Sequence, residues 1–474
     1  MVAIEAERIV PKLVDDIAEI IRIQCDNELE KLAIYNLLLA KWSSVLATKN
    51  IMTDSCRHTQ PFPLAYYGLN LLPSGGNKNK PLTAVESIFK WIDIEYENKN
   101  EENKQKYIEC AKEKVGKDNI TDKEIEKIEK KAENLLKLKS KTNGATSQKL
   151  YAICEQIVKS EFGSLFIYDT EFIKKFEAKI SGKSLDDTLD AIYNLYDGTP
   201  DFLDTVLTNR DFISGISCNV CYASDFSRLL RNSKTNKEFR NYLQDGFARR
   251  IYLYATKNVN SLQMQVNLPT VDELNRAKNK LVDFYHQTKE IYDKINATEV
   301  FEFSPKADIY IQKYQQKIKQ RIKEEFSYAE VLSDDDEILK INLNGSAWKI
   351  IKTAFLFHLI EHPTEHKVGV ESIQMAEQYF NAFHEKLAVF LKKKALDKLD
   401  EYKNVIYKNL GVEMLRNTEF RQELGVHHND WKVFCNTTLV DLIEELQTED
   451  IYVYEGRDGR KPTITFYRKE SENV

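Results

Sequence analysis

The sequence predicts an α/β protein built around a mostly parallel β-sheet, with large helical additions. Three apolar runs, at residues 62–72, 164–171 and 212–224, have the composition of buried strands, and helical segments separate them. A fourth run at 246–256 follows the same pattern. Strands that alternate with helices favour a parallel sheet. The low content of glycine (16) and proline (10) in 474 residues argues against a multi-stranded β protein.

Composition narrows the class of protein. The chain is 42% hydrophobic and 30% charged, which is typical of a globular chain rather than a disordered one. Its 68 basic and 74 acidic residues give a net charge of −6, so any nucleic-acid surface must be local. Seven scattered cysteines imply no disulfide framework. Residues 1–24 do not resemble a signal peptide, and no run of about 18 apolar residues occurs, so we expect a cytoplasmic protein without a membrane segment.

Four regions follow from the patterning along the chain. Residues 1–60 form an N-terminal helical region, and residues 61–330 form the α/β core. Within the core, residues 97–141 are dense in Lys and Glu around a sparse apolar stripe, which indicates a long, exposed helical hairpin. A second helical region covers residues 331–394, and we expect Ser333–Asp336, near its start, to be a polar loop between two helical segments.

Helical periodicity dominates the second half of the core and the region after it. The segments 270–330 and 345–394 are both expected to be helical. The last region, 395–474, begins with helices expected at 417–424 and 430–449. Alternating strands around a Gly-rich turn then predict a β-hairpin near residues 451–467. Helix-turn-helix followed by a hairpin is the outline of a winged helix.

Basic residues in this last region are candidates for DNA contact. Arg457, Arg460 and Lys461 gather at the hairpin tip, and Lys432 lies near the start of the second helix. Residues 395–474 contain 11 basic and 16 acidic residues, so DNA contact and the docking of a protein partner are both left open. A further DNA candidate is Arg210, at the end of a polar loop that begins at residue 196.

The strongest candidate site follows the first predicted strand, where a Gly-rich loop leads into a helix expected at 83–96. In such a loop, backbone N–H groups surround phosphates, a lysine reaches the terminal phosphates, and the helix N-terminus adds its dipole. The candidate nucleotide-binding residues are Ser74, Gly75, Gly76, Asn77, Lys78 and Asn79. Leu72, Asn77 and Asn79 depart from the G-x-x-x-x-G-K-[ST] motif, although Asn79 still offers an oxygen to Mg²⁺. A Gly-rich surface turn is the alternative.

Two further pairs of residues complete the candidate catalytic set. Asp169 ends a predicted buried strand and can hold a metal ion, and strand periodicity places Glu171 on the same side, where it can polarise water. Arg249 and Arg250 follow a glycine and can stabilise charge on a neighbour's γ-phosphate. An ordinary acid pair at a strand end and a surface salt-bridge pair are the alternatives.

The order of these features resembles the RecA-like, replicative-helicase-type P-loop ATPases of phages and mobile elements, over roughly residues 30–390. Lys78 matches the P-loop lysine, Asp169 matches the metal-holding acid, and Arg249 or Arg250 matches the arginine after a Gly-Phe element. The resemblance implies ATP and Mg²⁺ as cofactors, a hexameric ring on single-stranded DNA, and a separate primase or other replication proteins as partners. The usual Asp-Glu doublet is here Asp169-Thr-Glu171. A catalytically weak loader, scaffold or regulator on the same fold is the alternative function.

Two other patterns point to metal chemistry. His358, Glu361 and His362 match the H-x-x-E-H arrangement of inverted zinc peptidases, but Pro363 must end their helix and the surrounding residues are apolar. Cys218 and Cys221 form a C-x-x-C pair inside a predicted strand, where alternation directs the two sulfurs to opposite faces. Both are expected to be structural.

Overall fold

The computed structural model of the 474-residue chain divides into two compact units, Met1–Ala388 and Val389–Val474. The structure describes residues 8–27, 29–54, 61–72, 79–115, 121–133, 135, 137–142, 147–180, 192, 195–196, 216–226, 229, 233–256, 268–326, 333–411, 415–426, 431, 435, 438–447, 451–458 and 461–468. Among these residues, no helix is both long enough and apolar enough to span a bilayer.

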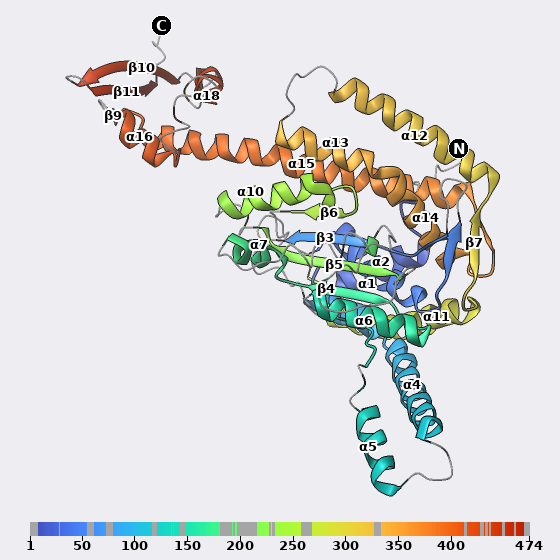
Figure 1. Ribbon diagram of the computed structural model, residues 1–474. Helices are drawn as coiled ribbons and strands as arrows, with labels where there is room; N and C mark the ends of the chain where they lie inside the picture. Colours follow the sequence, from blue (N-terminus) through green and yellow to red (C-terminus); the bar gives the residue numbers. More distant parts are fainter. Residues whose placement is uncertain are drawn as a thin grey trace. The chain divides into compact units, whose positions relative to one another are not determined.

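The core of the first unit is a four-stranded sheet in the order β4-β5-β3-β6, in which all neighbouring strands run parallel (Figure 1). Its strands are β3 (Tyr67–Leu72), β4 (Leu165–Asp169), β5 (Cys218–Asp225) and β6 (Tyr252–Ala255). Thr142 adds a parallel bridge to Ile167 of β4. The predicted α/β class is confirmed, and each of the four apolar runs covers all or nearly all of one strand of this parallel sheet.

Helices cover both faces of the parallel sheet. Helix α2 (Lys31–Ala47) crosses one face and is buried from Ala33 to Ala47, which explains why its sequence is apolar all round. On the opposite face, α7 (Phe172–Ile180) places the ring of Phe172 flat on Tyr222 of β5, with ring centroids 4.1 Å apart. Such two-sided burial is typical of parallel sheets and accounts for the continuous apolar character of the strands.

A buried polar network fixes α2 on the sheet. The side chain of Asn36 donates to Asn70 Oδ1 (2.9 Å) and to the Tyr252 carbonyl (3.0 Å), and it accepts from the Tyr66 hydroxyl (2.7 Å). Gly68 on β3 allows this approach, because a Cβ there would lie 2.9 Å from Asn36 Cγ. A satisfied buried network of this kind specifies one register between helix and strand.

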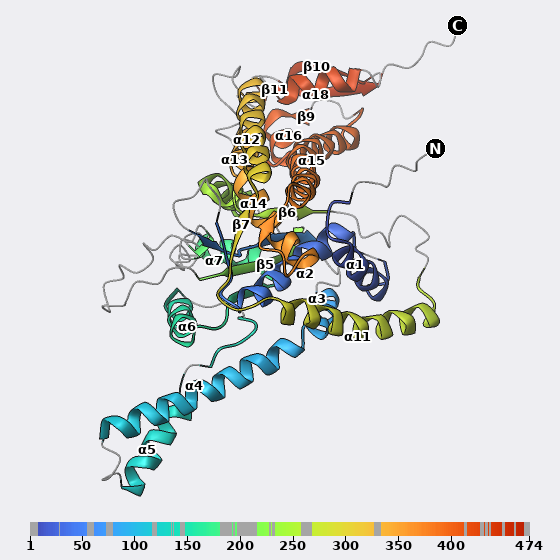
Figure 2. The same ribbon diagram turned by 90° about the vertical axis from the view of Figure 1, so that its right-hand side faces the viewer.

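The charged insertion forms the predicted helical hairpin. After α3 (Asn79–Ile88), α4 (Trp91–Val115) leads away from the sheet. Helix α5 (Asp122–Glu133) then folds back and packs against α4 (Figure 2). Asn100 ties the returning chain to α4, because its amide donates to the Leu138 carbonyl (3.0 Å) and accepts from the Leu138 N–H (2.8 Å).

Helices and a second small sheet complete the first unit. The helices are α1 (Lys12–Gln24), α6 (Ser147–Ser160), α10 (Ser233–Tyr242), α11 (Val271–Lys294), α12 (Pro305–Phe326), α13 (Asp334–Asn344) and α14 (Ser346–Glu361), and a π-helical turn, η1 (Leu243–Phe247), follows α10. The small sheet has the order β2-β1-β7-β8 and consists of β1 (Met52–Asp54), β2 (Phe62–Pro63), β7 (Val300–Phe303) and β8 (Lys367–Val368).

Two expectations for this part of the chain were wrong. The segments 270–330 and 345–394 are not helical throughout, because β7 and β8 interrupt them and pair with each other. The acidic stretch after Ser333 is the first turn of α13 rather than a loop. The Ser333 hydroxyl accepts from the Asp336 N–H (3.2 Å), and carboxylates near a helix N-terminus are favoured by its dipole.

The second unit combines short helices with a three-stranded antiparallel sheet. Helix α15 (Val370–Lys408) crosses the boundary between the units, and β9 (Leu415–Arg416), α16 (Asn417–Glu423), α18 (Thr438–Gln447), β10 (Ile451–Asp458) and β11 (Lys461–Arg468) follow. The strand order is β10-β11-β9. The predicted hairpin and first helix are confirmed, and the described residues of the expected second helix (431, 435 and 438–447) are helical. Phe420, Leu442 and Phe466 belong to a core of this unit's own.

Candidate functional site

The carboxyl edge of the parallel sheet brings together the described parts of the candidate nucleotide site. Strand β3 is an interior strand that ends at Leu72, and α3 begins at Asn79. The candidate residues Ser74, Gly75, Gly76, Asn77 and Lys78 lie outside the described residues. Asn79 itself is exposed in the first turn of α3. A strand and a helix thus flank residues 73–78, in the order that a phosphate-binding site of this kind requires.

Asp169 ends β4 with its carboxylate already engaged. Lys175 Nζ lies 2.8 Å from Asp169 Oδ2, and the Glu171 N–H donates to Oδ1 at 2.8 Å. Asp169 pairs with Tyr222 of β5, which in turn pairs with Leu69 of β3. The carboxylate is thus separated from β3 by one strand, which corresponds to about 10 Å between β4 and β3. Asp169 is therefore not directly beside the carboxyl end of β3.

The prediction that Glu171 shares a strand face with Asp169 was wrong. Strand β4 ends at Asp169, and Glu171 lies in the turn before α7, so the two-residue periodicity of a strand does not apply. Glu171 is exposed and forms an ion pair with Lys174, three residues along the chain. Its carboxylate therefore faces the outer surface of α7.

A third carboxylate, Asp225, was missed by the sequence reasoning, which ended the strand one residue earlier. The parallel register places Asp225 at the end of β5, directly beside Leu72. It is therefore level with the start of the candidate loop, whereas Asp169 lies three residues lower along the sheet. The available signal was the same as for Asp169, namely an acid that follows a buried strand.

The arginine pair lies at the opposite edge of the parallel sheet, just before β6. Gly246 adopts a φ of +112°, which favours glycine, and Arg250 Nη1 donates to its carbonyl at 3.0 Å. Arg250 is buried, with 5% of its surface exposed, whereas Arg249 is exposed. Of the two candidates, Arg249 is therefore the one that a second molecule can reach.

The turn that contains Arg249 packs against helices α13 and α14. Gly345, at their junction, packs directly on the backbone of Arg249. Lys349 is fully buried and donates to the carbonyls of Ala248 (3.1 Å) and Ile251 (3.2 Å), on either side of the arginine pair. Burial lowers the pKa of Lys349 well below its ordinary value. The position of Arg249 thus depends on residues about 100 positions away in the sequence.

The Lys349 contacts continue into a buried chain of polar groups. Lys349 also donates to Asn342 Oδ1, and the Asn342 amide lies 2.8 Å from His384 Nδ1. Burial and the nearby cations Arg321 and Lys349 lower the pKa of His384 to about 4. His384 is therefore neutral at pH 7, so its Nδ1 can accept from Asn342.

The structure describes few of the residues predicted to bind DNA. Arg210, Lys432 and Arg460 lie outside the described residues. Arg457 lies near the end of β10 and Lys461 begins β11, and only their backbone is described.

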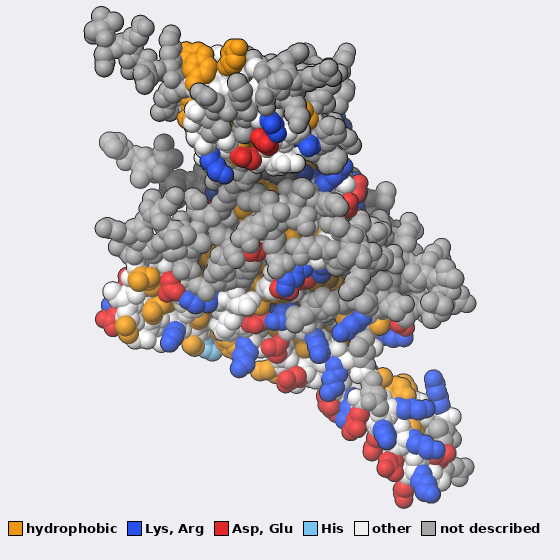
Figure 3. All heavy atoms as spheres, turned by 90° about the vertical axis from the view of Figure 1, so that its left-hand side faces the viewer, with side chains coloured by type: hydrophobic (Ala, Val, Ile, Leu, Met, Phe, Trp, Pro, Cys, Tyr) orange, Lys and Arg blue, Asp and Glu red, His pale blue; other side chains and the backbone are white. Residues whose placement is uncertain are grey.

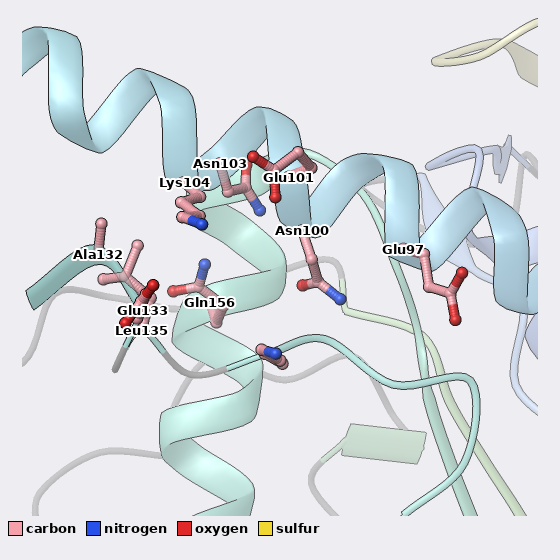
Figure 4. A pocket seen from close by; sticks show the side chains of 10 residues that line it. Glu97, Asn100, Glu101, Asn103, Lys104, Ala132, Glu133, Leu135 and Gln156 are labelled. Atoms are coloured by element: carbon pink, nitrogen blue, oxygen red, sulfur yellow. The ribbon is translucent and has the colours of Figure 1, made fainter. Parts of the chain in front are cut away.

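A polar cavity of about 410 Å³ lies at the base of the helical hairpin (Figure 4). Its lining includes Glu97, Asn100 and Lys104 of α4 and Gln156 of α6. No predicted site residue that the structure describes lines this cavity, so we do not assign it to the nucleotide site.

Residues of the two alternative metal motifs make other contacts in the structure. His358 is buried, and its Nε2 lies 2.6 Å from the Glu365 carbonyl, so this nitrogen must carry a proton and is not available as a ligand. Glu361 faces Arg8 at 3.5 Å. Cys218 and Cys221 are both buried on β5, and burial raises the pKa of Cys218 to about 12. Within the described ranges, no three or more His, Cys, Asp or Glu residues are grouped to hold a metal ion.

Comparison with known proteins does not place the chain in a family, because no family model and no curated protein matches the sequence.

Proposed function

We propose that the chain is a RecA-like P-loop NTPase that hydrolyses Mg-ATP and acts on single-stranded DNA, as a ring of identical subunits, during replication of a phage or mobile element. One observation carries the proposal. The Gly-rich, lysine-containing residues 73–78 connect an interior strand of a parallel sheet to the N-terminus of a helix, and ligands of such sheets bind at this edge.

The neighbouring strand ends support a magnesium role. Asp225 lies beside Leu72, and Asp169 ends the next strand. Carboxylates at this edge can hold Mg²⁺ and its waters opposite the phosphates that Lys78 and the loop N–H groups would bind. Asn79, at the start of α3, would contribute a neutral oxygen.

The second unit supports a DNA-directed role. Its order of helix, short strand, helix, helix and hairpin, with β9 added beside β11, agrees with the winged-helix outline. A separate primase or another replication protein would then be a partner of the ring.

One observation favours the alternative of a weak or inactive ATPase that serves as a loader or scaffold. Asp169 is engaged by Lys175 and by a backbone N–H, and the loop departs from the motif at Leu72, Asn77 and Asn79. Under this alternative, DNA or partner binding persists without ATP.

Hydrolysis of Mg-ATP by the purified chain, measured with and without single-stranded DNA, tests the proposal. We expect DNA-stimulated turnover in the wild type and at least ~100-fold less in Lys78→Ala, because this lysine would contact the terminal phosphates. Lys80→Ala is the matched control, since Lys80 lies two residues away and is paired with Asp26 at 2.6 Å. Equal turnover in wild type and Lys78→Ala would contradict the proposal, and no turnover in either protein would favour the loader.

A subunit-mixing experiment tests whether Arg249 acts in a neighbouring site. Arg249 and Leu72 lie at opposite edges of the same sheet, so a role at the phosphates requires a second copy. Lys78→Ala and Arg249→Ala are each expected to be inactive alone, whereas an equal mixture recovers turnover at about one interface in four, because each ring interface joins two different surfaces. If the mixture stays as inactive as its components, Arg249 has no role across the interface.

A further inference from the structure

The hairpin of the second unit carries three tyrosines on one face of its sheet. Tyr452 and Tyr454 lie on β10, and Tyr467 lies on β11 directly opposite Tyr452. Because side chains alternate along a strand, all three point to the same side. The rings of Tyr452 and Tyr467 stack at 5.9 Å and 26°, and Tyr454 and Tyr467 are 64% and 45% exposed. We call these three residues the tyrosine face.

The tyrosine face is not part of the unit's core. The alternate positions of the same strands, Ile451, Ile464 and Phe466, are buried and form the core together with residues of α15, α16 and α18. Figure 3 shows hydrophobic side chains exposed at the height of β10 and β11. Packing in the core of the unit therefore does not explain why these aromatic rings are exposed.

Gly456 leaves room for the ring of Tyr454 beside it on β10. It occupies the next position on the tyrosine face after Tyr454, and a Cβ there would lie 3.3 Å from Tyr454 Cε1 and 3.2 Å from Thr463 Oγ1. Without a side chain at 456, the Tyr454 ring can lie along β10 close to Gly456, and Tyr454 is still 64% exposed. An exposed aromatic ring is suited to stacking against another planar group.

Charge favours an anionic partner at the hairpin rather than at α18. Residues 451–468 contain four basic and two acidic residues. By contrast, α18 contains Asp441, Glu444 and Glu445 and has no basic residue. Arg416 on β9 is exposed and pairs with Thr463, which places it on the same side of the sheet as the tyrosines. A helix with this charge would be repelled by duplex phosphates, so α18 is unsuited to lie in a DNA groove.

We infer that the tyrosine face binds single-stranded DNA by stacking unpaired bases on Tyr454 and on the Tyr452–Tyr467 pair, while basic residues of the hairpin and Arg416 contact the phosphates. Aromatic rings on a sheet surface stack with any base and therefore bind without strong sequence preference. Duplex DNA hides its base faces and is bound less well. The inference rests on the proposed function only in the choice of DNA as the ligand, and it requires no nucleotide hydrolysis.

Fluorescence anisotropy with a labelled oligo-dT strand, the full-length chain and no nucleotide tests the inference. Combined Tyr454→Leu and Tyr467→Leu substitutions are expected to weaken binding by about 30-fold or more, because each base–aromatic stack that is lost lowers the affinity for the strand. The matched control is Tyr454→Phe with Tyr467→Phe, which keeps both rings and is expected to retain binding. Because both side chains are exposed, circular dichroism and thermal unfolding should show all variants folded like the wild type.

Three results would overturn the inference: unchanged affinity in the leucine variant, equal losses in the leucine and phenylalanine variants, or tighter binding of a duplex of the same length. If the wild type does not bind oligo-dT at all, the tyrosine face serves another ligand, such as a protein partner, and the inference is also overturned. ATP turnover by the wild type reports separately on the nucleotide site, so the two proposals fail independently.

Discussion

Replacing Gly345 by alanine is expected to destabilise the first unit by about 3 kcal/mol, because the added methyl group would overpack a rigid contact. Gly345 has φ −84° and ψ −5°, a conformation open to any residue, so the requirement for glycine is steric rather than conformational. A Cβ at this position would overlap the carbonyl oxygen and Cβ of Arg249 and would lie 2.6 Å from its Cα. Since these atoms are backbone or next to it, rotation of a side chain cannot relieve the overlap.

Urea unfolding of Gly345→Ala at neutral pH measures this effect, and Gly369→Ala is the matched control. A Cβ at Gly369 would approach only the end of the flexible Glu371 side chain, which can move away, so we expect a change below about 0.5 kcal/mol there. The folded fraction of Gly345→Ala should also lose ATP turnover as Arg249→Ala does, while binding nucleotide normally. Wild-type stability in Gly345→Ala would show that the Arg249 turn is not held against the junction of α13 and α14.

The elements that the sequence predicted best are those whose signal is local. The four apolar runs correctly predicted the strands of the parallel sheet, because strands that are buried on both faces have continuous apolar sequences. The charged helical hairpin was equally predictable from the sequence, because its helices are exposed and carry ion pairs between residues close in sequence, such as Lys99 and Glu102. By contrast, β7 and β8 are short, and each exists only through pairing with a partner distant in the sequence, so helical periodicity around them was misleading.

The candidate site depended on information that one sequence does not contain. The level of Asp225 relative to Leu72 is a matter of strand register, which forms only in the folded sheet. Glu171 was misplaced because strand periodicity was extended over the whole run 164–171, whereas β4 ends at Asp169. The separation of the arginine pair into a buried Arg250 and an exposed Arg249 follows from the turn at Gly246, and local sequence gives no sign of which residue turns inward.

Lys349→Met is expected to destabilise the chain by about 3 kcal/mol at pH 7, because three acceptors lose their donor and burying an unpaired polar group is costly. The acceptors are the carbonyls of Ala248 and Ile251 and the side chain of Asn342. Methionine matches the length of lysine and its contacts with Tyr252 and Phe380, so the loss reports on hydrogen bonds rather than on a cavity.

The pH dependence of this effect has a definite sign. Burial lowers the pKa of Lys349 in the folded state below its unfolded value of 10.5, so the unfolded chain binds more protons in the interval between the two values. Wild-type stability therefore rises with pH through that interval, whereas the methionine variant lacks this contribution. The difference in unfolding free energy between wild type and Lys349→Met should accordingly be larger at pH 9 than at pH 7, as measured by urea unfolding. Lys319→Met, on the exposed side of α12, should show no such change, and a difference independent of pH would mean that Lys349 is not buried against the Arg249 turn.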